Sequence, residues 1–114
     1  MKTLGSAKLA QKERDSIIKA SRVLKTELPV MRLILFGSKA RGTGEADSDI
    51  DLLVLTSCPV SSKLRSAISD RLADINLQND VLLTSVVVSE QDWSNGLIRY
   101  MLIHREAERD GCEI

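Results

Sequence analysis

Apolar residues recur at helical spacing in two long stretches of the chain. The first stretch predicts a helix over residues 7–28, and Pro29 ends it. The second predicts a helix over residues 62–76, followed by a turn at 78–80. Basic and acidic residues alternate on the outer side of the first helix, which indicates a solvated face. The apolar positions of these two helices are Ile17, Ala20, Leu24, Leu28, Leu64, Ile68, Leu72 and Ile75.

Short runs of branched apolar residues predict three strands, over residues 30–36, 50–55 and 81–88. The second run is apolar at nearly every position, which is typical of a strand covered on both faces. After the third strand, Ser89 resembles a helix N-cap, and Asn95-Gly96 is expected to end that helix early.

A last helix is predicted over residues 97–110, with Gly111 as its C-terminal cap. The predicted order is therefore α-β-β-α-β-α, an α/β (α+β) domain with a small mixed sheet backed by helices. Residues 1–6 carry no such pattern and are expected to be a loose leader.

Composition and charge narrow the class of protein. A chain of 114 residues is expected to form one domain, residues 1–114. Lys plus Arg and Asp plus Glu both count 16, so no net field attracts nucleic acid or an anionic membrane. The start has no apolar signal-peptide core and no run is long enough to cross a membrane. Cys58 and Cys112 lack metal-ligand spacing and form no disulfide framework, so a cytoplasmic location is expected.

Two acidic residues stand at the mouth of the second strand. Asp49 and Asp51 alternate with Ile50, and side chains two apart on a strand point to the same side. Two adjacent carboxylates repel each other unless a cation lies between them. Oxygen ligands favour Mg²⁺ or Mn²⁺ over zinc, and such an ion takes its remaining ligands from water and substrate phosphates. The pair therefore indicates a divalent metal site.

The end of the first strand carries a complementary signal. Gly37 lets a phosphate approach the backbone, and the amides of the next turn, with the Ser38 hydroxyl, can hold phosphate oxygens. Lys39 and Arg41 add positive charge nearby. This is not a Walker A loop, because Thr43 stands where the lysine must be. A metal-bound nucleoside triphosphate satisfies both halves of the pattern.

The motif Gly37-Ser38-x-x-Arg41-Gly42, followed by Ser48-Asp49-x-Asp51, resembles the signature of the DNA polymerase β-like nucleotidyltransferase superfamily. More narrowly, it resembles the minimal nucleotidyltransferases (MNT type). The resemblance implies transfer of a nucleoside monophosphate, AMP from ATP, to an acceptor hydroxyl with release of pyrophosphate. It implies metal binding by the two aspartates and triphosphate contact by the glycine-serine turn.

The family usually places a third acid on the neighbouring strand, as a metal ligand and a base for the acceptor hydroxyl. Asp80 is the candidate here, although an Asn-Asp pair is also ordinary turn chemistry, so both interpretations stay open. Asp74 is the second choice, but it falls within a helical pattern and is expected at the surface. Asp47 is expected to cap the central loop rather than to extend the acidic pair.

Two functions from different classes remain. The first is a Mg²⁺-dependent nucleotidyltransferase that modifies a protein hydroxyl, in a pair with a helical partner of the HEPN type. The second is an antitoxin that neutralises such a partner by complex formation alone. The partner follows only from the resemblance, and a homo-oligomer is also compatible with the chain. His104 is expected at the surface or in packing, and Trp93 and Tyr100 are expected in the core or in an interface. The chain has three aromatic residues, Phe36, Trp93 and Tyr100, which are few for base stacking.

Overall fold

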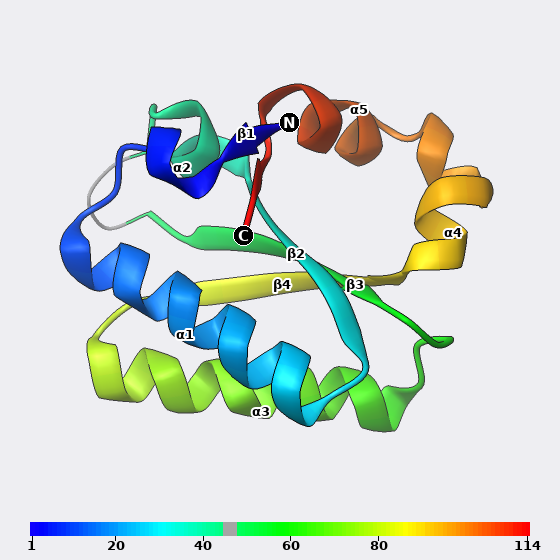
Figure 1. Cartoon of the computed structure of the whole chain (residues 1–114), viewed down its shortest axis with the longest axis horizontal. Helices are drawn as coiled ribbons and strands as arrows, with labels where there is room; N and C mark the ends of the chain where they lie inside the picture. The colour runs from blue at the N-terminus through cyan, green and yellow to red at the C-terminus, as the bar shows by residue number, and fades with distance from the viewer. Residues whose placement is uncertain (45–47) are drawn as a thin grey trace.

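The computed structural model describes residues 1–44 and 48–114, so Asp47, predicted to cap the central loop, lies outside the described residues. The chain forms a mixed sheet of five strands in the order β1-β5-β2-β3-β4, with helices on both faces. In Figure 1, α1 and α3 lie on one side of the sheet and α4 and α5 on the other. The predicted α/β (α+β) class is confirmed.

The first long helix, α1 (Gln11–Glu27), begins later than the predicted 7–28. Residues 8–10 are not helical, and Glu13 in the first turn accepts a hydrogen bond from the backbone N–H of Ala10 at 2.9 Å. The helix ends before Pro29, as predicted. The N-terminal end is therefore set by a side-chain cap that the apolar spacing does not report.

The central strands form as predicted. β2 (Val30–Phe36) runs antiparallel to β3 (Ile50–Thr56), and β3 runs parallel to β4 (Leu83–Ser89). β4 begins two residues later than predicted, because α3 (Ser62–Asn79) continues three residues beyond the predicted end at 76. The turn predicted at 78–80 is thus mostly helix.

The two ends of the chain contribute strands that the sequence pattern did not predict. β1 (Lys2–Thr3) pairs in parallel with β5 (Cys112–Glu113), and β5 pairs with β2. Residues 4–6 form a 3-10 turn, η1 (Leu4–Ser6), to which the Arg14 guanidinium is bonded through the Leu4 carbonyl at 3.0 Å. The expected loose leader is therefore wrong: these residues belong to the sheet edge.

The C-terminal helical region is broken into three pieces. Ser89 caps α4 (Glu90–Asn95) by accepting from the Asp92 N–H at 3.1 Å, as expected. The helix predicted over 97–110 is instead a 3-10 turn, η2 (Leu97–Tyr100), followed by α5 (Leu102–Asp110). Met101 is extended, with φ −87° and ψ 158°, and separates them. Gly111 follows α5 as predicted.

Side-chain alternation on the strands divides the interior into two cores. Leu52 and Val54 pack with α1 and α3, whereas Leu53 and Leu55 pack with Trp93 of α4 and Ala107 of α5. β3 is therefore covered on both faces over this length, as its continuous apolar run indicates.

Residues expected in packing roles divide between core and surface. Trp93 is buried and its ring stacks on His104 with centroids 4.3 Å apart, whereas the Tyr100 side chain is mostly exposed. Cys58 and Cys112 are free thiols, and burial raises the pKa of Cys112. In the part of the chain that the structure describes, no helix has the length and apolar character needed to cross a membrane.

Candidate active site

The end of β2 and the start of β3 lie side by side and bring the glycine-serine turn onto Asp51. The antiparallel register pairs Phe36 with Asp51. Gly37 has a φ of +75°, and a Cβ atom built there would lie 2.5 Å from Asp51 Oδ2. Only glycine lets the backbone come this close to the carboxylate. The predicted phosphate-binding turn and one predicted metal ligand therefore meet at one point of the sheet.

The Asp51 carboxylate faces the side of the sheet that carries α4 and α5. Its neighbours Ile50 and Leu52 point into the α1/α3 core, and Leu53 points into the α4/α5 core. Because successive side chains on a strand alternate, Asp51 shares the face of Leu53. Thr84, its register partner on β4, donates a hydrogen bond from Oγ1 to Asp51 Oδ1 at 2.9 Å. Asp51 is thus held between two strands.

Asp49 stands just before β3 and is exposed to solvent. The buried side chain of Ile50 separates it from Asp51. Because Asp49 precedes the regular strand, the common direction of the two carboxylates stays a prediction. Asp49 is exposed and Asp51 is half-buried, so the pair is open to a ligand from solvent.

The loop after β2 forms a compact turn around Ser38. α2 (Gly37–Arg41) begins at the strand end, and its first amides have no acceptor within the helix. The chain then folds back: the Thr43 N–H bonds the Ser38 carbonyl at 3.0 Å. A Cβ at Gly44 would lie 2.8 Å from Ser48 Oγ and 3.0 Å from Ser38 Oγ. Two hydroxyls therefore flank the backbone of this turn, close to the two aspartates.

Lys39, a predicted nucleotide contact, lies in a buried ion pair. Its Nζ is 2.8 Å from Glu13 Oε2, and both side chains are nearly inaccessible, at 5% and 9%. Burial raises the pKa of Glu13, but the hydrogen bonds from Lys39 and the Ala10 N–H, with the lysine's charge, outweigh it and hold the pKa below its usual value. The pair connects the glycine-serine turn to α1. Arg41, the other predicted cation, is exposed at the end of α2.

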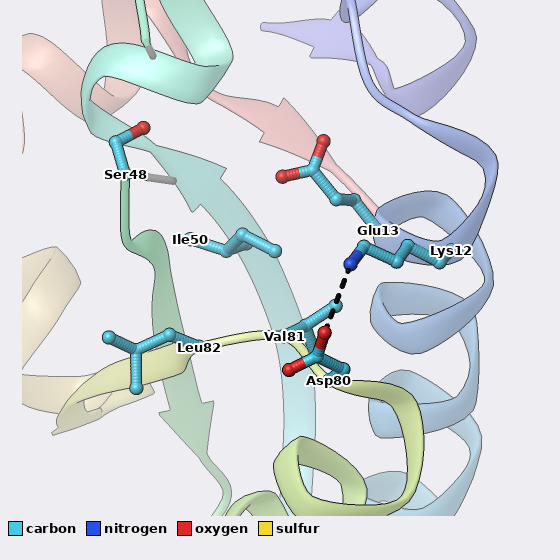
Figure 2. A pocket seen from close by; sticks show the side chains of 7 residues that line it. All are labelled: Lys12, Glu13, Ser48, Ile50, Asp80, Val81 and Leu82. Atoms are coloured by element: carbon cyan, nitrogen blue, oxygen red, sulfur yellow. Dashed lines mark ion pairs between the residues drawn. The ribbon is translucent and has the colours of Figure 1, made fainter. Parts of the chain in front are cut away.

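Asp80 occupies the C-cap of α3 in a left-handed conformation, with φ 54°. Its fully exposed carboxylate lies 3.6 Å from Lys12 Nζ of α1. Figure 2 shows this ion pair at the rim of a hollow of about 230 Å³. The hollow is lined by Lys12, Glu13, Ser48, Ile50, Asp80, Val81 and Leu82.

Asp80 and Asp51 belong to different sides of the sheet. Ser48 and Asp80 line the same hollow, but its walls are α1 and the segment just before β4, on the face opposite to the Asp51 carboxylate. The β4 residue in register with Asp51 is Thr84, four positions after Asp80. Asp74 is exposed on α3, near Lys19 and Arg71. The geometry joins neither acid to the carboxylate pair, and the catalytic role predicted for Asp80 stays a prediction.

The residues present fit a Mg²⁺ or Mn²⁺ ion held jointly with a substrate. Within residues 1–44 and 48–114, no three carboxylate, imidazole or thiol groups gather closely enough to hold a metal by themselves. Mg²⁺ is commonly bound by one or two carboxylates, with phosphates and waters completing the shell. Asp49 and Asp51 supply that number beside a turn suited to phosphate. A soft or all-protein metal site is not supported by this donor set.

Sequence reasoning missed two residues of the site. Thr84 is the first polar residue in the apolar run 81–88, and this polar position within the run was the available signal. Glu13 gave none, because its partner Lys39 is far along the chain and only the packing of α1 against the turn brings them together.

Alanine in place of Gly37 is expected to lower both the free energy of unfolding and the affinity for Mn²⁺ at Asp51. The positive φ disfavours an L-residue by about 1–2 kcal/mol, and the new methyl group displaces the carboxylate. Urea unfolding measures the first effect, and Mn²⁺ binding measures the second.

Gly42→Ala is the matched control for this change. Gly42 has nearly the same φ, +76°, but among residues 1–44 and 48–114 a Cβ there meets only Lys8 Cδ, at 3.8 Å. It should lose similar backbone stability and keep its metal affinity. Equal Mn²⁺ affinities for the two variants would contradict the close approach of Gly37 to Asp51.

Comparison with known proteins points to one family. A model of the nucleotidyltransferase domain matches residues 17–106. A protein of Methanocaldococcus jannaschii with the provisional name protein adenylyltransferase is 34% identical over 67 residues, which are 59% of this chain. The match spans 66% of that relative, slightly less than two thirds of its length.

Solved structures share the fold at low sequence identity. A crystal structure of a toxin-antitoxin with AMP-PNP superposes with a TM-score of 0.59 at 20% identity, covering 91% of this chain and 72% of that one. The toxin-antitoxin MntA-HepT superposes with a TM-score of 0.56 at 18% identity, covering 88% and 69%. At these identities the likeness shows the fold alone.

Proposed function

Because the chain belongs to the nucleotidyltransferase domain family, we propose that it transfers AMP from ATP to a hydroxyl group of a partner protein and releases pyrophosphate. The observation that carries this proposal is the contact between Gly37 and Asp51. A turn suited to phosphate oxygens and a carboxylate pair suited to a divalent cation meet there. A metal-bound nucleoside triphosphate is the ligand that needs both.

The chain's own groups have separate tasks in this reaction. The amides at the start of α2 and the Ser38 hydroxyl bind phosphate oxygens, and Asp49 and Asp51 hold Mg²⁺ or Mn²⁺. When bound, the ion neutralises charge on the phosphates. The acceptor oxygen forms a bond to the α-phosphorus while the bond to the pyrophosphate oxygen breaks. Positioning and charge neutralisation carry most of the catalysis in such transfers.

Adenosine and a protein acceptor are supported by the relatives. The Methanocaldococcus jannaschii protein carries the name of a protein adenylyltransferase, and one structural neighbour was solved with AMP-PNP. Another neighbour was solved as a variant with two aspartates, two residues apart, changed to glutamate. That spacing is the spacing of Asp49 and Asp51 here.

A protein partner is also supported by the surface. Several structural neighbours are toxin-antitoxin pairs, and we infer that the partner here is a helical toxin of the HEPN type. Large apolar side chains are exposed in succession along η2 and the start of α5. Exposed apolar patches are typical of protein interaction sites. The exposed residues are Leu97, Tyr100, Met101 and Leu102.

A non-catalytic antitoxin is the second candidate, and one observation favours it. The position on β4 in register with Asp51 is a threonine, not an acid, and the described residues contain no group of three side chains placed to hold a metal ion by themselves. A site without a general base on this strand is expected to transfer slowly. In that case the domain would act by covering its partner.

Label transfer separates the two candidates. The chain is incubated with its co-purified or genetically adjacent helical partner, Mg²⁺, and ATP labelled at either the α- or the γ-phosphate. Nucleotidyl transfer predicts partner labelling from the α-labelled ATP only, and no labelling when EDTA replaces Mg²⁺. Label from the γ-phosphate would instead indicate phosphoryl transfer.

Asp70→Asn serves as the control, because Asp70 is an exposed acid on α3 away from the carboxylate pair, and it should label the partner normally. Parallel reactions with the other three nucleotides test the preference for adenosine. A stable complex that acquires no α-label would overturn the proposed activity and support the non-catalytic antitoxin.

A further inference from the structure

We propose that Thr84 is a positioning residue for Asp51. The site then has a hydroxyl on β4 at the position in register with Asp51, where a carboxylate could otherwise stand. The inference rests on the proposed function and deepens it. It names a residue on β4 that acts on the reaction only through the orientation of Asp51.

The contact is direct and its geometry is well defined. Asp51 and Thr84 are register partners on parallel strands, and their side chains share the α4/α5 face. Thr84 Oγ1 lies 2.9 Å from Asp51 Oδ1 and 3.5 Å from the Ile50 carbonyl oxygen. The shorter contact, to a charged acceptor, is the stronger one. A β-branched side chain on a strand has few χ1 choices, so the hydroxyl stays where the strand places it.

The hydrogen bond from Thr84 fixes which oxygen of Asp51 faces β4 and which faces the glycine-serine turn. Oδ1 accepts from Thr84, and Oδ2 faces the backbone of Gly37, where a Cβ would be only 2.5 Å away. Without the hydroxyl, the carboxylate is free to rotate about its Cβ–Cγ bond and lose this orientation. Thr84 therefore keeps one oxygen directed to the turn that is proposed to hold the phosphates. Groups that orient a ligand in this way affect metal affinity strongly.

Threonine also sets the charge of the site. A hydroxyl donates to Asp51 but carries no negative charge and is not a base near neutral pH. Among the described residues, the site therefore offers a cation the two carboxylates of Asp49 and Asp51 and none from β4. The proton of the acceptor hydroxyl must leave to some group other than residue 84.

Mn²⁺ binding tests the role of Thr84 without relying on turnover. Affinity for MnCl₂ in the presence of a non-hydrolysable ATP analogue is measured by electron paramagnetic resonance. Thr84→Val removes the hydroxyl and keeps the shape, and it is expected to weaken Mn²⁺ binding about tenfold. Thr84→Ser keeps the hydroxyl and should stay within about twofold of wild type. Label transfer should show a lower rate for the valine variant, with rescue by serine.

Ser85→Ala is the matched control, because it removes a hydroxyl one residue along the same strand, on the other face. If the valine variant melts early, Thr84→Ala gives a second hydroxyl-free site for the same comparison. Equal Mn²⁺ affinity for wild type and both hydroxyl-free variants would overturn the role of Thr84 and leave the proposed function standing. A wild-type chain that binds no Mn²⁺ with the nucleotide analogue would overturn both.

Discussion

Asparagine in place of Asp51 is expected to slow nucleotidyl transfer about 10³-fold, equivalent to about 4 kcal/mol of transition-state stabilisation. The side chain keeps its size and can still accept the hydrogen bond from Thr84, but it loses the charge that holds a divalent cation. Stability should change little. The rate is measured by transfer of α-label from ATP to the partner at saturating Mg²⁺.

Two variants make this result specific. Asp70→Asn removes an exposed acid from α3 and should transfer at the wild-type rate. Asp80→Asn measures the untested role of Asp80: as the acceptor's base it would lose rate by a similar factor, and as a partner of Lys12 alone it would not. Near-normal transfer by Asp51→Asn would contradict the assignment of the metal site to this strand.

Methionine in place of Lys39 is expected to lower the free energy of unfolding by about 3–5 kcal/mol, the usual effect of removing one partner from a buried pair. Lys39 and Glu13 lie 2.8 Å apart with almost no solvent access, so the variant leaves a buried carboxylate without its cation. Urea unfolding at neutral pH measures the loss. It also tests whether the glycine-serine turn depends on α1 for its position.

Two control variants distinguish the loss of stability caused by a buried unpaired charge from the loss caused by removing any ion pair. Lys12→Met removes an exposed ion pair at 3.6 Å and should cost less than about 1 kcal/mol. Replacing both buried partners, Lys39→Met with Glu13→Leu, should recover much of the loss, because an apolar pair leaves no unpaired charge. Similar losses for Lys39→Met and Lys12→Met would contradict the buried state of the first pair.

The same pair predicts a dependence on pH. The pKa of Glu13 in the folded chain is below its usual value of 4.5, so the unfolded chain binds this proton more readily. The contribution of Glu13 is therefore complete above about pH 4.5 and is lost as pH falls through the folded-state pKa. The stability gap between wild type and Lys39→Met should be largest near neutral pH and should narrow in acid.

The sequence predicted the centre of this molecule better than its connections. The strand from Val30 to Phe36 and the start of the strand at Ile50 follow from dense runs of branched apolar residues, and the structure has them at those positions. The meeting of Gly37 with Asp51 follows from the antiparallel pairing of two neighbouring strands. Local pattern and strand order were enough for these features.

Other features depend on packing that no local pattern encodes. Two-residue strands such as Lys2–Thr3 are too short to show a period. Lys39 is predicted to contact the nucleotide, and its ion pair with Glu13 arises only from the packing of α1 against the turn. Asp80 is the candidate third acid because it opens the predicted strand 81–88, whereas β4 begins at Leu83 and Asp80 caps α3. The sequence of one chain does not predict which helix covers which face of a sheet.

Strand β3 works as a partition inside the domain. Its odd-numbered side chains, Asp51 among them, lie on one face, and its even-numbered ones lie on the other, where Ile50 lines the hollow beside α1. Substitutions at Lys12 and Leu82 would therefore alter the face of the sheet opposite to Asp51 and Thr84. The buried ion pair between Lys39 and Glu13 connects the glycine-serine turn to α1, which borders the hollow. Even in a chain this small, the surface around the hollow can therefore change in sequence while the surface around Asp51 and Thr84 is kept.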